Sequence, residues 1–391
     1  MNIETEILII GGGIAGLCAA KEATTYQAKV MLIDKKEKLT TPQTEYITKK
    51  SLRQLNIKAN PDWIIKETKG FTLNVPDKTK IVLDEENVAL PEPAYIVNLD
   101  KLTRDLQKSV ENNITIKLDT TATKISRQKN QVQVTIEENG TTSTITTDIL
   151  IIAEGTENNL SKQVELEYDN TPDKTKTLIQ YEITSSDVKS SDMIDMYYGS
   201  YSPGGYVCVM PKDENTQYIT MATQNNKTNK TQQHMEDFIK NQLKIDDYEI
   251  NNKLIKEIPG NGVSRERVQD NIILTGDAAG FINPLTNMKI DAAIGSGTYA
   301  GIVASNLVFD GDYQKEYVNK FTMYTDMLIN EDFTRYNETR KFLQSLTDDD
   351  LNIMARELQE NTIYESDIDN IIRAMIDYCS KASLQLKTLY R

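Results

Sequence analysis

Apolar runs near the amino terminus flank a helical pattern. The run EILII at residues 6–10 is β-branched and continuous, as expected for a strand that is buried on both faces. The segment LCAAKEATTY at residues 17–26 predicts a helix, and AKVMLID at residues 28–34 predicts a second strand. Strand, helix and strand in this order predict a parallel βαβ unit.

The middle of the chain has a different pattern, in which polar and apolar residues alternate. Residues 63–97 contain only short extended runs, and the next clear helix is predicted at residues 98–113. Strand patterns then flank Asn139-Gly140, a dipeptide typical of a β-hairpin. Residues 175–223 alternate as further antiparallel strands, and an apolar run at residues 273–275 then leads into a second glycine-containing loop.

The last part of the chain is helical by pattern. Residues 311–345 carry tyrosines and phenylalanines at helical spacing, which is typical of core packing. Residues 348–361 and 365–386 predict two more helices, each with acidic residues in its first turn.

The order of these elements predicts an α/β protein with an α+β second domain. A Rossmann-like nucleotide-binding domain is interrupted by a mostly antiparallel sheet domain and is followed by a helical C-terminal region. We expect residues 1–165 and 255–310 to form the discontinuous first domain, residues 166–254 the sheet domain, and residues 311–391 the helical region.

The first loop carries a dinucleotide-binding motif. Gly11-x-Gly13-x-x-Gly16 lies between the predicted strand and helix, and Asp34 ends the second strand. In this motif the first glycine permits a tight turn, the second lets the backbone approach a pyrophosphate, and the third lets helix and strand pack closely. Asp34 is placed to bind ribose hydroxyls. The alternative is a glycine-rich turn that binds no ligand.

Composition and charge narrow the function classes. The chain has 391 residues, 44 basic and 58 acidic, with a formal net charge of −14. This charge repels nucleic acid and anionic lipid headgroups, so we expect no nucleic-acid partner. No run of about 18 to 20 uninterrupted apolar residues predicts a membrane span, and the amino terminus has no signal-peptide pattern.

Cysteine and histidine are too few for several kinds of chemistry. Cys18, Cys208 and Cys379 are far apart in sequence and form no CxxC pair, which favours a reducing cytoplasm. The single histidine, His234, lies in a polar helical run. We therefore expect neither a metal site nor histidine-based catalysis.

Four landmarks resemble those of one flavoprotein group. They are Gly11 to Gly16 with Asp34, then Ala153-Glu154-Gly155, Pro203-Gly204-Gly205-Tyr206, and GDAAGFINPLT at residues 276–286. The chain resembles, over about residues 5–345, the reductases and hydroxylases related to para-hydroxybenzoate hydroxylase, and among them the geranylgeranyl reductases. The last landmark is the most specific for that subfamily.

The resemblance implies that two distant loops bind one FAD. The first loop holds the pyrophosphate and adenosine, Asp277 contacts ribityl or ribose hydroxyls, and a helix that begins after Pro284 points at the flavin pyrimidine. A buried Asp277 that only caps a helix is the alternative. The cofactor-binding residues expected on this basis are Gly11, Gly13, Ile14, Ala15, Gly16, Asp34, Lys35, Ala122, Glu154, Gly155, Gly276, Asp277, Asn287 and Met288.

The resemblance also implies a lipid substrate. Geranylgeranyl reductases saturate double bonds of isoprenoid chains, in archaeal-type lipids or related prenyl compounds, with hydride from reduced FAD. Their Tyr-x-Trp-x-Phe-Pro motif corresponds here to Tyr206, Cys208, Met210 and Pro211, the expected substrate residues. Only the tyrosine and the proline are kept, which predicts a differently shaped tunnel. Cys208 could equally be an ordinary core residue.

Other departures leave the catalytic residues unassigned. Thr44 occupies a position where many members have a cysteine beside the flavin, so no thiol acts there. Asn287-Met288-Lys289 replaces glycines that let the backbone approach the flavin ring. These side chains either crowd the ring, or Lys289 sets its charge against the flavin anion.

The electron donor and the exact activity stay open. No second G-x-G-x-x-G is present for a nicotinamide coenzyme, which favours a ferredoxin-like protein or a small reductant as donor. We expect a cytoplasmic protein that can contact a membrane peripherally, through apolar surface because of its charge. Alternatives are an FAD-dependent monooxygenase or halogenase of the same fold, and a flavin- or isoprenoid-binding protein without catalysis.

Overall fold

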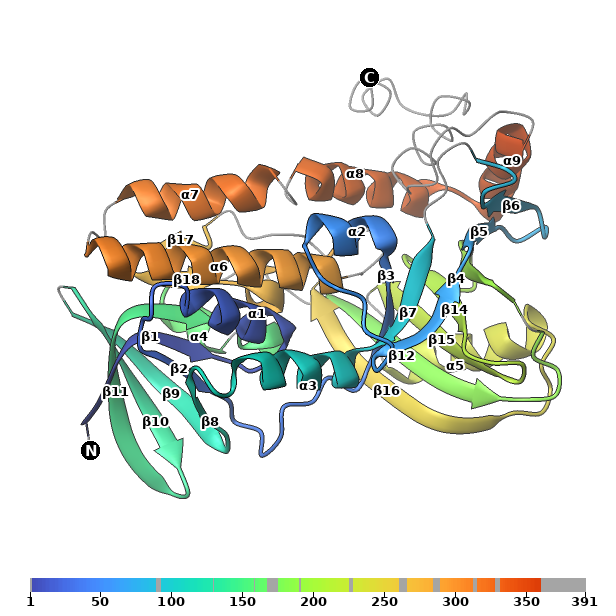
Figure 1. Cartoon of the computed structure of the whole chain (residues 1–391). Coiled ribbons are helices and arrows are strands. Elements are labelled where there is room, and N and C mark those ends of the chain that lie inside the picture. Colours follow the sequence, from blue (N-terminus) through green and yellow to red (C-terminus); the bar gives the residue numbers. More distant parts are fainter. Residues whose placement is uncertain are drawn as a thin grey trace.

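The computed structural model describes residues 2–88, 93–128, 130–157, 159–166, 175–189, 191–224, 228–259, 266–283, 289–311, 315–327 and 331–359. Within them, three sheets are flanked by helices, and the chain crosses between the sheets several times (Figure 1). The predicted α/β class with a Rossmann-like nucleotide-binding part is confirmed.

The nucleotide-binding sheet has parallel strands at its centre. β1 pairs in parallel with both β2 and β11, and β18 pairs in parallel with β11. β11 and β10 form the predicted hairpin, because Asn139 and Gly140 both adopt the positive φ that this turn needs. The strands are β1 (Asn2–Ile10), β2 (Val30–Ile33), β8 (Thr115–Lys117), β9 (Thr120–Arg127), β10 (Val132–Glu138), β11 (Thr141–Ile152), β17 (Val268–Gln269) and β18 (Ile272–Leu274).

Helices cover this sheet and bury its apolar strands. α1 follows β1 as the βαβ pattern predicts, and α6 packs along α1 (Figure 1). α6 is long and apolar enough to span a membrane, but 67% of its apolar window is buried inside the protein, as in a core helix. The helices of this part of the protein are α1 (Ile14–Ala23), α3 (Leu99–Val110), α4 (Asn159–Gln163), α6 (Ile290–Asp310) and α7 (Lys315–Thr325).

The second large sheet is mostly antiparallel and has the order β16-β12-β15-β14-β13-β5-β6. α5 (Thr228–Asn241) covers one face of it. β5 and β6 come from the part of the chain that precedes residue 165, and β16 extends to Pro259. The strands are β5 (Gly70–Asn74), β6 (Lys80–Leu83), β12 (Thr175–Thr184), β13 (Met193–Tyr197), β14 (Tyr206–Pro211), β15 (Thr216–Gln224) and β16 (Glu249–Pro259).

A small third sheet packs against the other face of the antiparallel sheet. It has the order β3-β7-β4, from β3 (Thr44–Thr48), β7 (Ala94–Asn98) and β4 (Ile64–Thr68), with α2 (Lys49–Gln54) following β3. α8 (Glu331–Ser345) and α9 (Asp348–Gln359) close the same side, and α8 continues the line of α7 (Figure 1). The helix predicted at residues 365–386 lies outside the described residues.

The contact between α1 and α6 depends on two glycines of α6. A β-carbon at Gly297 would lie 2.2 Å from the carbonyl oxygen of Ala15, and one at Gly301 would lie 2.3 Å from that of Ala19. Both distances are far below van der Waals contact. The missing side chains therefore let the two helix backbones approach closely.

We predict that Gly301→Ala destabilises the protein by up to about 2 kcal/mol. Alanine gains roughly 1 kcal/mol of helix propensity over glycine, but a clash with backbone typically costs about 1 to 3 kcal/mol. Gly295→Ala in the same helix is the control, because its β-carbon would meet only a leucine methyl, at 3.4 Å. Thermal unfolding should show a lower Tm for the first variant and an equal or higher Tm for the second; equal effects would contradict this account.

Candidate functional site

A cavity of about 460 Å³ lies at the carboxyl ends of β1, β2 and β11. This is the edge where open α/β sheets bind ligands. Residues of the glycine loop form one wall, and Asp277 and Lys289 form another. Leu254 and Lys256 of β16 also contribute, so the antiparallel sheet closes the cavity. Its volume lies in the range of about 300 to 1,000 Å³ that is usual for ligand pockets.

The three motif glycines have different roles. Gly11 has a φ of +105°, and a β-carbon there would lie 2.2 Å from the carbonyl oxygen of Ala153. A β-carbon at Gly16 would lie 1.9 Å from the carbonyl oxygen of Gly11. Among the residues that the structure describes, no atom lies within 4 Å of a β-carbon added at Gly13, and the residue lines the cavity. Gly11 and Gly16 therefore serve packing, whereas Gly13 leaves room for a ligand.

The amino terminus of α1 faces the space beside Gly13. Ile14 and Ala15 line the cavity, and no side chain caps the helix at Gly13. The first backbone N–H groups of a helix have no partner within the helix and carry partial positive charge. They are suited to an anion such as a pyrophosphate.

Asp34 lies across the loop from Gly13. Its Oδ2 accepts a hydrogen bond of 2.7 Å from the Gly12 N–H, and its Oδ1 accepts one of 2.8 Å from the Lys36 N–H. These bonds fix the carboxylate at the cavity wall. Lys35 also lines the cavity and forms an ion pair with Glu157. Ala122, at the start of β9, lines the same side.

The Glu154 side chain stabilises the start of α4. Its carboxylate accepts hydrogen bonds from the N–H groups of Leu160 and Ser161 at 2.9 to 3.1 Å. It thereby satisfies donors at the start of α4. Glu154 and Gly155 both line the cavity.

Asp277 forms a buried ion pair with Lys289. The Lys289 Nζ lies 2.5 Å from Asp277 Oδ2, and each side chain is only 14% exposed. Lys289 therefore lines the cavity with its charge matched by a carboxylate. Gly276, with a φ of +61°, lies outside the cavity lining and packs against Ala15, where a β-carbon would lie 2.7 Å from the alanine side chain. Asn287 and Met288 lie outside the described residues.

Further charged groups join this pair. Lys256 donates a hydrogen bond to Gln43 Oε1, and Gln43 Nε2 donates one of 2.7 Å to Glu45 Oε1. Glu45 is 4% exposed. We call Gln43, Glu45, Lys256, Asp277 and Lys289 the ionic cluster. It joins β3, β16 and the start of α6 at one end of the cavity.

The ionic cluster shifts the pKa values of its members. Burial raises the pKa of the Glu45 carboxyl, although the two lysines oppose this shift. Burial lowers the pKa of Lys289, but Asp277 and Glu45 outweigh it and the net pKa is raised. Burial and the Lys289 charge lower the pKa of Lys256 to about 7. Lys256 can therefore take up and release a proton near neutral pH.

Three of the four expected substrate residues lie beside this cluster. Tyr206, Cys208 and Met210 line a small cavity of about 20 Å³ together with Glu45 and other residues of β3. Alternate residues of a strand point to the same face, so Pro211 belongs to the opposite face of β14, with Val207 and Val209. Burial raises the pKa of the Cys208 thiol, which makes it a packing residue rather than a nucleophile at neutral pH.

The cavity thus gathers most of the expected cofactor residues. Those in its lining are Gly11, Gly13, Ile14, Ala15, Asp34, Lys35, Ala122, Glu154, Gly155 and Asp277. Gln43, Glu45 and Lys256 were not predicted from the sequence. The sequence did contain a signal for Lys256. Its side chain points to the same inward face of β16 as those of Leu254 and Ile258, and a lysine is unusual at such a position.

Comparison with known proteins agrees with this site. Residues 4–299 match the FAD binding domain family. The chain is 32% identical to digeranylgeranylglycerophospholipid reductase 2 of Methanosphaera stadtmanae over 99% of this chain and 100% of that protein. It is 28% identical to digeranylgeranylglycerophospholipid reductase 1 of Methanothermobacter thermautotrophicus, covering 100% and 99% of the two chains.

A solved structure shares the fold. The crystal structure of a geranylgeranyl bacteriochlorophyll reductase-like protein from Thermoplasma acidophilum superposes with a TM-score of 0.92 at 23% identity, and covers 100% of both chains. The resemblance that the sequence predicted is confirmed. The chain belongs to the geranylgeranyl reductase family of FAD-dependent oxidoreductases.

Proposed function

We propose that this protein reduces C=C bonds in the geranylgeranyl chains of a glycerophospholipid. The observation that carries the proposal is the shared wall between two cavities. Gln43 lines both the large cavity and the small cavity of Tyr206, Cys208 and Met210. An apolar chain on the face of β14 would therefore end beside the ligand of the large cavity. The curated relatives, named for a reductase of this lipid class, support the same function.

The residues of the large cavity fit FAD. Gly13 and the open amino terminus of α1 suit the pyrophosphate, and Asp34 suits ribose hydroxyls. The ionic cluster then lies at the flavin end. When bound, FAD supplies the hydride that adds to one alkene carbon.

Residues of this chain would control the proton and the water. Lys256 Nζ holds a proton near neutral pH at the wall of the large cavity, and Leu178, which faces it across the strands, lines the small cavity. We infer that Lys256 holds the proton for the second alkene carbon. Tyr206, Cys208 and Met210 are each less than 5% exposed, so water is excluded where the chain would lie.

We infer the class of electron donor from motif content and the manner of membrane contact from charge. With one G-x-G-x-x-G in the sequence, we propose that a ferredoxin-like protein or a small reductant supplies electrons. A net charge of −14 is unfavourable at anionic membranes, so the protein would reach a membrane lipid through apolar surface.

The function is tested by anaerobic reduction of the flavin followed by mixing. We expect a lipid with geranylgeranyl chains to reoxidise the flavin and to gain two hydrogens per double bond, measured by absorbance and mass spectrometry. Its fully saturated counterpart is the control and should leave the flavin reduced. Rapid product formation only with oxygen would instead indicate a monooxygenase, and no reoxidation by either would indicate a binding protein.

Gly13→Val separates cofactor binding from folding. The β-carbon of the added side chain meets no atom of the described part of the chain within 4 Å, but the side chain would occupy the space for the pyrophosphate. We expect this variant to fold with a normal circular dichroism spectrum and to lose its flavin absorbance. Gly11→Val is the contrasting variant, because its side chain would clash with Ala153 and should prevent folding. A Gly13→Val protein that keeps its flavin absorbance would contradict the assignment of this space to FAD.

Lys256→Met tests the proton assignment. A lysine whose pKa is lowered to about 7 donates a proton below that pH and loses it above, so lipid-dependent reoxidation should slow as pH rises through 7. The variant should lose this inflection and react on the order of 10²-fold more slowly. Lys253→Met, an exposed lysine of the same strand, is the control with an unchanged profile. An inflection near pH 7 that survives in Lys256→Met would assign it to another group.

A further inference from the structure

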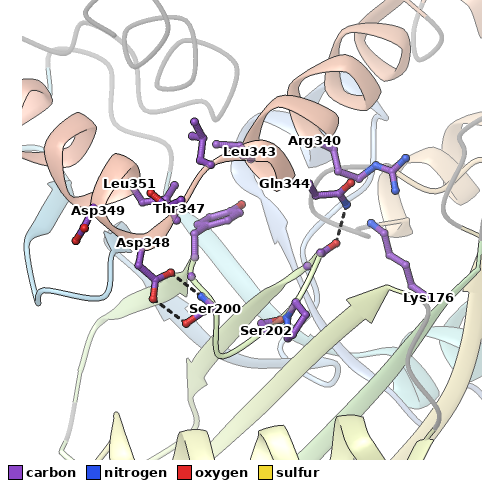
Figure 2. A pocket seen from close by; sticks show the side chains of 16 residues that line it. Lys176, Ser200, Ser202, Arg340, Leu343, Gln344, Thr347, Asp348, Asp349 and Leu351 are labelled. Atoms are coloured by element: carbon purple, nitrogen blue, oxygen red, sulfur yellow. Dashed lines mark hydrogen bonds between the residues drawn. The ribbon is translucent and has the colours of Figure 1, made fainter. Parts of the chain in front are cut away.

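Carboxyl groups line the cavities of this protein in different surroundings. A cavity of about 620 Å³ lies between the loop at residues 199–205, α8 and the start of α9 (Figure 2). There Asp348 accepts hydrogen bonds from the N–H and hydroxyl of Ser200 at 2.8 and 2.7 Å. In the large cavity, Asp277 is paired with Lys289. The small cavity differs, because its carboxyl group has an oxygen without a partner among the described residues.

This carboxyl group belongs to Glu45, the one acidic residue that lines the small cavity among the described residues. Oε1 of Glu45 accepts a hydrogen bond of 2.7 Å from Gln43 Nε2. Oε2 is buried and has no hydrogen-bond partner in the described part of the chain. A buried oxygen without a donor is costly as part of a carboxylate, whereas in the neutral acid it can carry the proton. The surroundings of Oε2 therefore favour the neutral acid.

Two hydrogen bonds decide which oxygen of Glu45 carries that proton. Lys256 Nζ donates to the Gln43 side-chain oxygen, so the Gln43 amide nitrogen faces Glu45. This nitrogen donates to Oε1, which therefore serves as an acceptor. The proton of neutral Glu45 then resides on Oε2, the oxygen that no described donor occupies.

The charges around Glu45 suit a group that holds a proton and also releases it. Burial raises the pKa of the carboxyl group, and the cations of Lys289 and Lys256 act in the opposite direction. Asp277 and Asp291 add to the upward shift of this pKa. Burial therefore retains the proton on Glu45, and two cations stabilise the carboxylate that remains after the proton has left.

The other acidic groups of the small cavity are weaker. Phenols and thiols ordinarily ionise at about pH 10 and 8.5, whereas a glutamate carboxyl ionises at about 4.3. Burial raises the pKa of the Tyr46 phenol and of the Cys208 thiol further. Among the described residues of this cavity, Glu45 is therefore the group that gives up a proton most readily.

Glu45 also connects the two cavities. It lines the small cavity together with Tyr206, Cys208 and Met210, which are the expected substrate residues. Through Gln43 it is linked to Lys256 in the wall of the large cavity. An alkene in the small cavity would therefore have an acid on this side and the cofactor of the large cavity beside it.

We propose that Glu45 transfers the proton to the alkene from Oε2 and that Lys256 then restores it. The inference rests on the proposed reduction of isoprenoid double bonds. The O–H bond of Glu45 breaks, and the π electron pair of the alkene forms a C–H bond at the less substituted carbon. The more substituted carbon, which carries the positive charge, accepts the hydride with its two electrons from reduced FAD. Glu45 is left as a carboxylate and FAD is oxidised.

The proposal gives Glu45 and Lys256 separate roles. Glu45 contacts the alkene, whereas Lys256 holds the next proton at the wall of the large cavity. The Lys256 ammonium stabilises the carboxylate as it forms, then protonates it and regains a proton from water. Loss of the Lys256 charge therefore slows both the transfer and the recovery of Glu45.

The test is anaerobic reoxidation of the reduced full-length flavoprotein by a lipid with geranylgeranyl chains. Glu45→Gln keeps the size of the neutral acid but has no proton to transfer. We expect this variant to react on the order of 10²-fold more slowly, with a dissociation constant for the lipid within twofold of wild type. Glu45→Asp keeps an acid at this position and should react faster than Glu45→Gln. Flavin absorbance and Tm confirm that each variant is folded.

Glu182→Gln is the matched control. Glu182 follows Gln180 on β12 and is paired with Lys212 at 2.7 Å, and it lies outside the lining of the small cavity. Its lipid-dependent rate should equal that of wild type. Ferricyanide, which takes electrons without protonation of a carbon, should reoxidise wild type and Glu45→Gln equally fast. Slow reoxidation of Glu45→Gln by both acceptors would place the defect in the flavin site and overturn the proposal.

Infrared spectroscopy supplies a readout that does not depend on turnover. A protonated carboxyl group has a carbonyl band that a carboxylate lacks. We expect such a band near neutral pH in wild type and in Glu182→Gln, and its loss in Glu45→Gln. Absence of the band, or a wild-type lipid rate in Glu45→Gln, would overturn the role of Glu45 and leave the reductase function standing. Failure of the lipid to reoxidise the wild-type flavin would refute the reductase function itself.

Discussion

The backbone of α1 lies so close to its neighbours that side chains are excluded on two sides. On one side Gly16 faces the carbonyl oxygen of Gly11, and on the other Gly297 and Gly301 of α6 face carbonyl oxygens of α1. This double contact fixes where the helix begins and therefore where its free N–H groups point. The cavity at the carboxyl ends of the strands has its shape because α1 cannot shift, and α6 brings Lys289 to the same place.

The antiparallel sheet supplies the walls of the site that the nucleotide-binding part does not form. Its inner face carries Lys256 at the large cavity, Cys208 in the small one and Lys176 at the far end. Strand pairing sets these positions: Leu178 lies opposite Lys256 on one neighbour and opposite Ala222 on the other. A shift of the register by one residue would turn all of these groups to the face covered by α5.

The sequence was most informative where the chemistry is local. The glycine loop and Asp34 lie within one stretch of 24 residues. The local backbone explains the residue type at each of these positions. The hairpin at Asn139-Gly140 was predictable for the same reason. The ionic cluster was not, because Gln43, Lys256 and Asp277 lie in or next to strands of three different sheets and meet only where these sheets pack together, which no local pattern specifies.

Lysines at inward-facing strand positions are a sequence signal of charged groups on the inner face of the antiparallel sheet. Lys256 alternates with Leu254 and Ile258, and Lys176 shares its parity with Leu178. A buried lysine costs free energy unless another group compensates its charge. At Lys256 the compensation comes partly from loss of the proton, as its lowered pKa shows.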